Sequence, residues 1–268
     1  MTKASLSEIE SLYMSNPWLV TNRLKRTVDL RLFCFPFAGG GAIAYHSWAK
    51  QLPETIEVNA IRLPGREMRI GEAPITQWRP LIHQLVTALQ TKLDKPFVFY
   101  GHSLGTLLAF ESARELRRRG LPLPKLLVVT GREAAHMPPI IMPDLQLPEG
   151  QFIRSIHNSF GGISEAILEN EELVELLEPI LRADFTLVEN HVFVPEEPFN
   201  FPIIACTGIN DMPTQVGVQA WASHTTNSFQ CHTMPGGHFF IESERGALLE
   251  IIRTALIDLT EGLGRSNF

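Results

Sequence analysis

Long hydrophobic runs are absent from this sequence, and their absence argues against two classes of protein. No apolar stretch among the 268 residues approaches the ~18 residues that a membrane-spanning helix needs. Residues 1–8 carry Lys3 and Glu8 among small polar side chains and lack the apolar segment of a secretory signal. We therefore expect no membrane partner and a cytoplasmic location.

Cysteine and net positive charge are also scarce. The cysteines are Cys34, Cys206 and Cys231, an odd number, and each lies in a segment with strand-like composition. Buried free thiols in a reducing compartment are therefore expected, rather than a disulfide framework. The 23 basic residues stand against 29 acidic ones, a net charge of −6. This balance gives the chain no general attraction to nucleic acid or to an anionic membrane.

A short apolar strand followed by an amphipathic helix is the repeating pattern of the chain. Apolar residues spaced by three and four positions predict helices that begin near Trp78, Leu107 and Leu248. The alternation predicts an α/β fold, a single domain over residues 1–268 with a mostly parallel sheet flanked by helices. The predicted strands are nearly continuous apolar runs, typical of parallel strands covered on both faces: Leu30–Phe35, Glu57–Leu63, Phe97–Tyr100, Leu126–Thr130, Ile203–Thr207 and Phe229–Met234.

One segment interrupts this alternation. No strand pattern appears between Thr130 and Ile203, a separation far longer than an ordinary connection. Prolines open and close the segment, and we interpret residues 138–200 as an inserted helical lid. A helical crossover without a gating role is the alternative. Short helices are predicted around 150–156, 165–170 and 173–181, with an apolar inner face (Phe152, Ile156, Ile167, Leu168, Leu176, Leu177) and glutamates outside (Glu165, Glu169, Glu171, Glu172, Glu175, Glu178).

The run Gly101-His102-Ser103-Leu104-Gly105 fits the pattern G-x-S-x-G. The bare pattern occurs by chance, but here a predicted strand precedes it and a predicted helix follows it, which is the context of a nucleophile elbow. Such a turn strains the backbone at the serine, and small neighbours let the strand and the helix approach closely. The run predicts Ser103 as the nucleophile of an α/β-hydrolase fold; a structural serine in a tight turn is the alternative.

A serine nucleophile needs a base, and the base needs an acid that orients it. In this fold the chain order is serine, acid, histidine. Asp211 follows the strand that begins at Ile203, and His238 follows the last predicted strand through Pro235-Gly236-Gly237. They are the predicted acid and base, because catalytic groups gather at the C-terminal ends of parallel strands. Asp144 and Asp184 are the rival acids, and a turn or helix-capping role is the alternative for Asp211.

An oxyanion hole needs two backbone amides aimed at one point. The predicted donors are Leu104, directly after the nucleophile, and a residue of the glycine-rich loop after the first predicted strand. In that loop Ala38 is preferred over Phe37, which we place among the substrate contacts. A phosphate-binding loop is the competing interpretation, but neither a Lys-Ser/Thr ending nor a full G-x-G-x-x-G is present.

Together these segments resemble the type II thioesterases of polyketide and nonribosomal peptide synthetases, a group that includes the medium-chain acyl thioesterase of fatty acid synthase. The resemblance implies a Ser-His-Asp hydrolase that removes acyl groups from the phosphopantetheine arm of an acyl- or peptidyl-carrier protein, without a metal or organic cofactor. We expect it to act as a monomer. The matching stretches run in order through most of the chain: 35–41, 62–67, 100–105, 181–184 and 235–240.

A docking surface and several rival activities also follow from the sequence. Carrier proteins of this kind are generally acidic, as the resemblance implies, so Arg66 and Arg69, beside Arg62, are predicted carrier contacts. The alternative is that these arginines pair internally with Glu67, Glu72 or other carboxylates and only hold the loop. A fatty acyl thioesterase, an acyltransferase or an esterase can use the same triad, and a non-catalytic carrier-binding module is the rival outside the enzymes.

Overall fold

A seven-stranded sheet forms the centre of the part of the chain that this computed structural model describes, residues 16–22, 27–139 and 141–265. The strand order is β1-β3-β2-β4-β5-β6-β7, and β1 alone among them runs antiparallel to its neighbour. All six predicted strands are present. Their bounds are β2 Leu30–Phe35, β3 Ile56–Ile61, β4 Phe97–His102, β5 Leu127–Thr130, β6 Ile203–Gly208 and β7 Phe229–Met234.

Strand β1 (Leu19–Asn22) is an edge strand that the sequence analysis did not predict. It pairs with β3 in the register Leu19 to Ile61, and the Thr21 hydroxyl donates to Asn59 Oδ1 at 2.8 Å. Its four residues carry no alternating pattern of their own, so the pairing with β3 determines it.

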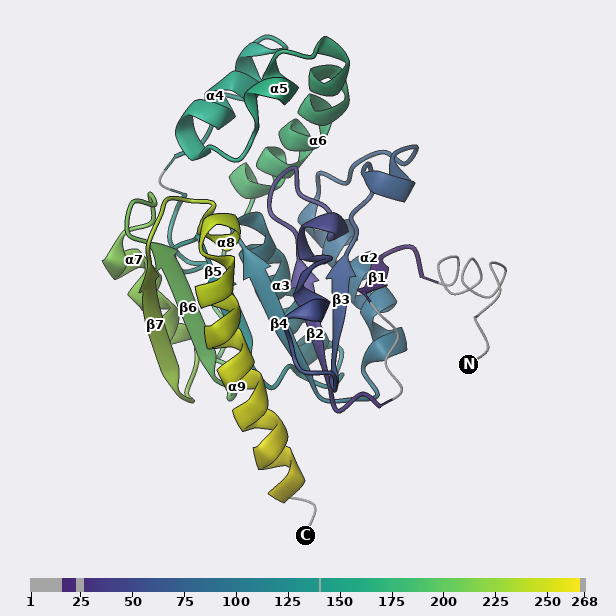
Figure 1. The fold of residues 1–268 in the computed structure, drawn as a ribbon, viewed down its shortest axis with the longest axis vertical. Coiled ribbons are helices and arrows are strands. Elements are labelled where there is room, and N and C mark those ends of the chain that lie inside the picture. The colour runs from purple at the N-terminus through teal and green to yellow at the C-terminus, as the bar shows by residue number, and fades with distance from the viewer. Residues whose placement is uncertain (1–15, 23–26, 140, 266–268) are drawn as a thin grey trace.

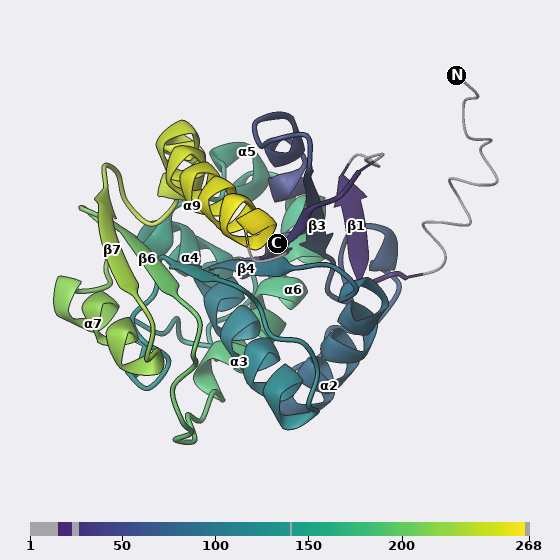
Figure 2. The same cartoon turned by 90° about the horizontal axis from the view of Figure 1, so that it is seen from below.

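Helices cover both faces of the sheet (Figures 1 and 2). On one face, α2 (Trp78–Leu89) and α3 (Leu104–Arg118) pack against the phenylalanines of β2 and β4. On the other, α9 (Arg245–Arg265) and α8 (Phe240–Ser243) pack with Trp48 and Tyr100. The short α7 (Gln215–Gln219) lies beside β6. Burial of these apolar faces stabilises each crossover by ~25 cal/mol per Å² removed from water.

Three helices stand over the C-terminal edge of the sheet, at the top of Figure 1: α4 (Gln151–Phe160), α5 (Glu165–Leu168) and α6 (Glu171–Glu189). They enclose a third apolar cluster, separate from the two cores on the sheet. Their position agrees with an inserted helical segment; that it acts as a lid stays a prediction. Within the described residues, no helix is both long and apolar enough to cross a bilayer.

Two details of the lid differ from the prediction. Helix α6 does not end near Leu181 but continues to Glu189, where Leu187 and Val188 join the core between the sheet and helices α2 and α3. Leu176, expected on the inner face, is 52% exposed, and Glu178, expected outside, is buried. Glu178 faces inward because its carboxylate accepts from the Gly150 amide at 2.7 Å and pairs with Arg182. Helical periodicity could not reveal these partners.

Candidate active site

Ser103 occupies a strained turn between β4 and α3. Its φ is +54°, one of two positive values among the described non-glycine residues, and its amide donates to the Thr130 carbonyl at 2.8 Å. A Cβ at Gly101 would lie 2.2 Å from the Gly105 carbonyl oxygen, and one at Gly105 would lie 2.2 Å from that of Phe35. Only glycine fits at these two positions, because both contacts are to backbone.

Asp211 and His238 meet as the sequence predicts. Asp211 follows β6, His238 follows β7, and His238 Nδ1 lies 2.9 Å from Asp211 Oδ1. Asp211 Oδ1 also accepts from the Met212 amide at 2.7 Å. Both side chains are buried. This contact to Nδ1 leaves Nε2 of the imidazole as the nitrogen able to act as a base.

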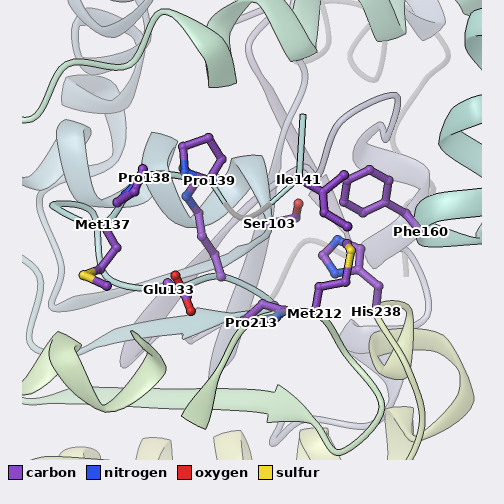
Figure 3. A pocket seen from close by; sticks show the side chains of 12 residues that line it. Ser103, Glu133, Met137, Pro138, Pro139, Ile141, Phe160, Met212, Pro213 and His238 are labelled. Carbon is purple, nitrogen blue, oxygen red and sulfur yellow. The ribbon is translucent and has the colours of Figure 1, made fainter. Parts of the chain in front are cut away.

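The Ser103 hydroxyl and the His238 ring line one pocket of about 50 Å³ (Figure 3). The other wall is mainly apolar, with Phe160 near the imidazole and Pro138 and Pro139 across from it. Phe160 belongs to α4, so the lid contributes directly to this pocket. Arg132 and Glu133 line it as well. Neither is among the predicted site residues, although both follow the C-terminal end of β5 as Asp211 follows that of β6.

A larger cavity of about 600 Å³ adjoins the glycine-rich loop. Phe37 and Ala38 form one wall, and the opposite wall comes from the lid helices through Ile156, Leu177 and Leu181. Phe37 also packs edge-on against Phe239, with ring centroids 5.2 Å apart. The predicted apolar inner face of the lid is therefore present for Ile156 and Leu177.

His102, the variable residue of the G-x-S-x-G pattern, packs against His238. Its ring is buried, 5.0 Å from the His238 ring, and its Nδ1 lies 2.9 Å from Thr130 Oγ1. Burial, followed by the neighbouring His238, holds the pKa of His102 well below its usual value. A neutral ring therefore lies beside His238, the predicted base. The pattern itself allows any residue here, so it gave no signal for this role.

The predicted donor loop is fixed by contacts from elsewhere in the chain. Gly39 has φ +73° and donates its amide to Asp184 Oδ2 at 2.8 Å, while Gly40 donates to the Phe37 carbonyl at 2.9 Å. Leu104, the other predicted oxyanion donor, is the first residue of α3. The amides of Ala38 and Leu104 stay the predicted oxyanion donors.

The arginines predicted to meet a carrier protein are buried, which contradicts the exposed surface expected of them. Arg66 forms a bidentate ion pair with Asp184, and Arg69 pairs with Glu72 at 2.6 Å. Arg62 pairs with Glu67 at 3.0 Å. Each guanidinium is buried against a carboxylate of this chain, as the alternative of internal pairing expected, so these arginines present no exposed docking surface. The same contacts place Asp184, a rival for the triad acid, in the ion pair with Arg66, while Asp211 is the carboxylate that contacts His238.

A mostly parallel sheet flanked by helices, with a strained serine turn at its C-terminal edge, is the architecture of the α/β-hydrolases. The sequence profile described as Thioesterase domain matches residues 30–256. The chain therefore belongs to the thioesterase family, and it is an enzyme that hydrolyses thioesters.

Individual relatives agree with this assignment. The chain is 37% identical to the gramicidin S biosynthesis protein GrsT of Aneurinibacillus migulanus, over 88% of this chain and 93% of that protein. It is 33% identical to the solved RedJ thioesterase of the prodiginine pathway in Streptomyces coelicolor, with a TM-score of 0.80 over 88% and 94% of the two chains. It is also 33% identical to the solved type II thioesterase BorB of the borrelidin biosynthetic cluster, with a TM-score of 0.78 over 88% of this chain and 96% of that one. The predicted resemblance to type II thioesterases is thus confirmed.

Proposed function

We propose that this enzyme removes acyl groups from the phosphopantetheine arm of carrier proteins, as an editing type II thioesterase of a polyketide or nonribosomal peptide pathway. The observation that carries the proposal is the Asp211–His238 pair beside the strained Ser103, in a chain of the thioesterase family. Its relatives support the pathway: GrsT, RedJ and BorB are named for the biosynthesis of gramicidin S, prodiginine and borrelidin, and YbtT, 26% identical, is the type II thioesterase of the yersiniabactin NRPS/PKS pathway.

The proposed reaction starts at Ser103. His238 Nε2 takes the hydroxyl proton as Oγ attacks the thioester carbonyl, and Asp211 holds the imidazole through Nδ1. The amides of Leu104 and Ala38 stabilise the oxyanion of the tetrahedral intermediate. When this intermediate collapses, the C–S bond breaks and the pantetheine sulfur leaves with the proton from His238.

The second half returns the enzyme to its starting state. His238 takes a proton from water, the hydroxide attacks the acyl-serine ester, and the C–O bond to Ser103 breaks as the serine recovers its proton. The products are a free carboxylic acid and a free thiol. Access for the acyl chain is supported by the cavity between the glycine-rich loop and the lid helices, whose apolar wall suits an alkyl chain.

The decisive test is mass spectrometry of a panel of acylated carrier proteins, before and after treatment with enzyme. We expect the wild type to release free acids, and Ser103→Ala to lose on the order of 10⁶-fold in turnover, as in other triads. Near wild-type hydrolysis by Ser103→Ala would refute the nucleophile. A fluorophosphonate probe that labels the wild type but not the variant would exclude a non-catalytic binding module.

The rival activities separate in the same assay. An acyltransferase yields an ester or amide instead of the free acid when alcohols and amines are added. An esterase prefers oxygen esters to matched thioesters. A fatty acyl thioesterase prefers medium or long chains over the short or aminoacyl groups that an editing enzyme removes.

A further inference from the structure

A buried ion pair holds the loop that carries the predicted oxyanion donor. Arg66 Nη1 and Nη2 donate to Asp184 Oδ2 and Oδ1 at 2.9 and 2.8 Å, and Nη1 also donates to the Gly40 carbonyl at 2.8 Å. Asp184 Oδ2 accepts from the Gly39 amide at 2.8 Å. The two side chains are 5% and 2% exposed. The pair therefore binds a donor and an acceptor of the loop, directly after Ala38.

The loop has little intrinsic order, since it contains Gly39-Gly40-Gly41 and glycine has the largest conformational freedom to lose. A second ion pair supports its far end: Glu67 accepts from the Ile43 amide at 2.9 Å and from Arg62 at 3.0 Å. Contacts from outside the loop thus determine its conformation at both ends.

The charges of Arg66 and Asp184 are needed to fix the glycine-rich loop. Burying an ion pair is costly, and apolar residues of equal volume often stabilise a fold as well or better. Here the pair does what apolar residues cannot, because it satisfies two backbone groups at the loop through charge-assisted hydrogen bonds.

Asp184 lies on α6, so the lid helix itself takes part. A Cβ on Gly39 would lie 2.6 Å from Leu181 Cδ2, which shows how closely α6 approaches the loop. The position of α6 and the position of the loop are therefore linked by direct contact.

We propose that Arg66 and Asp184 are positioning residues of the oxyanion hole, which fix the loop so that the Ala38 amide points at the oxyanion. This inference rests on the Ser103 mechanism proposed above, but not on the carrier protein as substrate. An amide stabilises the transition state only at hydrogen-bond distance from the oxyanion. A shift of ~1 Å at such a site can cost ~10²-fold in rate.

The test compares Asp184→Asn, which keeps the shape of the side chain but removes its charge, with Glu57→Gln. Glu57 is also buried and paired with an arginine, Arg31 at 2.8 Å, but this pair joins β2 and β3 away from the site. We expect Asp184→Asn to lower kcat ~10- to 100-fold with little change in KM. Glu57→Gln should lower stability while kcat stays near wild type.

A second readout separates positioning from damage. Affinity for a trifluoromethyl ketone that forms a tetrahedral adduct with Ser103 should fall by the same factor as kcat/KM, while affinity for the carboxylate product stays unchanged. For Arg66→Lys, which keeps one charge contact, the ketone affinity and kcat/KM should lie between those of the wild type and those of Asp184→Asn. Unchanged ketone affinity in Asp184→Asn, or an equal loss of kcat in Glu57→Gln, would overturn the inference.

A p-nitrophenyl ester serves as the substrate for these comparisons. It needs Ser103 and the oxyanion hole but no carrier protein. If the wild type cleaves the ester and leaves acylated carriers intact, the proposed substrate is wrong and the positioning role is still measured. If Asp184→Asn cleaves the ester as fast as the wild type, the positioning role is wrong whatever the carrier result.

Discussion

Two buried histidines should make this protein lose stability in mild acid. His102 is enclosed beside His238, and His224 lies among Phe110 and Trp221, with His136 Nδ1 2.8 Å from its Nε2. Burial, helped by His136, lowers the pKa of His224 to about 4, and burial holds the pKa of His102 well below its usual value. An unfolded histidine has a pKa of ~6.5.

The direction of the effect follows from proton counting. Between pH 6.5 and 5 the unfolded chain takes up a proton at each of these positions and the folded protein does not, so the free energy of unfolding falls as the pH falls. Integrated from pH 7 to 5, the loss is ~2 kcal/mol for each histidine, or ~4 kcal/mol for both. Carboxylates with lowered pKa values, such as Glu57 and Glu196, lose their contribution to the free energy of unfolding only below pH ~4.5. They therefore do not affect the change between pH 7 and pH 5.

Urea unfolding followed by tryptophan fluorescence at pH 7, 6 and 5 measures this loss. His224→Gln and His102→Gln should each remove about half of the difference in the free energy of unfolding between pH 7 and pH 5. The exposed His83→Gln controls for the substitution itself. A pH dependence that is flat in the wild type, or that survives in full in both buried variants, would refute the reasoning.

Three further outcomes follow from the site. Asp211→Asn should reduce kcat ~10⁴-fold and leave the melting temperature close to wild type, and kcat within tenfold of wild type would mean that another acid orients His238. Gly101→Ala should destabilise the protein by ~1–3 kcal/mol or more and abolish labelling of Ser103, since its Cβ meets backbone at 2.2 Å; an active, stable variant would contradict the required close approach. Hydrogen exchange should be faster in residues 151–178 than in β4 and β6, and equal protection would argue against a gating lid.

Local patterns were sufficient to predict the sheet and the arrangement of Asp211 and His238. Strands β2 and β7 have the predicted bounds. Strand β2 is buried along its whole length, as a nearly continuous apolar run predicts, whereas β7 is a partly exposed edge strand. Asp211 and His238 could be found because chain order and position after a strand end constrain them strongly.

The structure differs from the prediction where a residue far away in the sequence determines the burial or the secondary structure of a segment. Arg66 reads as a surface cation, but its partner Asp184 lies 118 positions further along the chain and buries it. Strand β1 depends on β3 in the same way, with Thr21 and Asn59 joined across 38 positions. The predicted end of helix α6 is too early because its last turn, with Leu187 and Val188, leaves the lid cluster and packs in the core on the sheet, and a change of partner leaves no mark in helical periodicity.

The course of α6 limits how lids can be exchanged between relatives. Pro179 divides the helix, and its ring already removes one backbone hydrogen bond there. A transplanted lid that ends at this proline leaves Asp184 with its native neighbours, whereas one that includes the whole helix must supply its own carboxylate at position 184 to accept from the Gly39 amide. The incoming segment must also bring a carboxylate at position 178 for Arg182. Chimeras joined after Glu189 should therefore turn over slowly only where the incoming helix lacks a carboxylate at position 184.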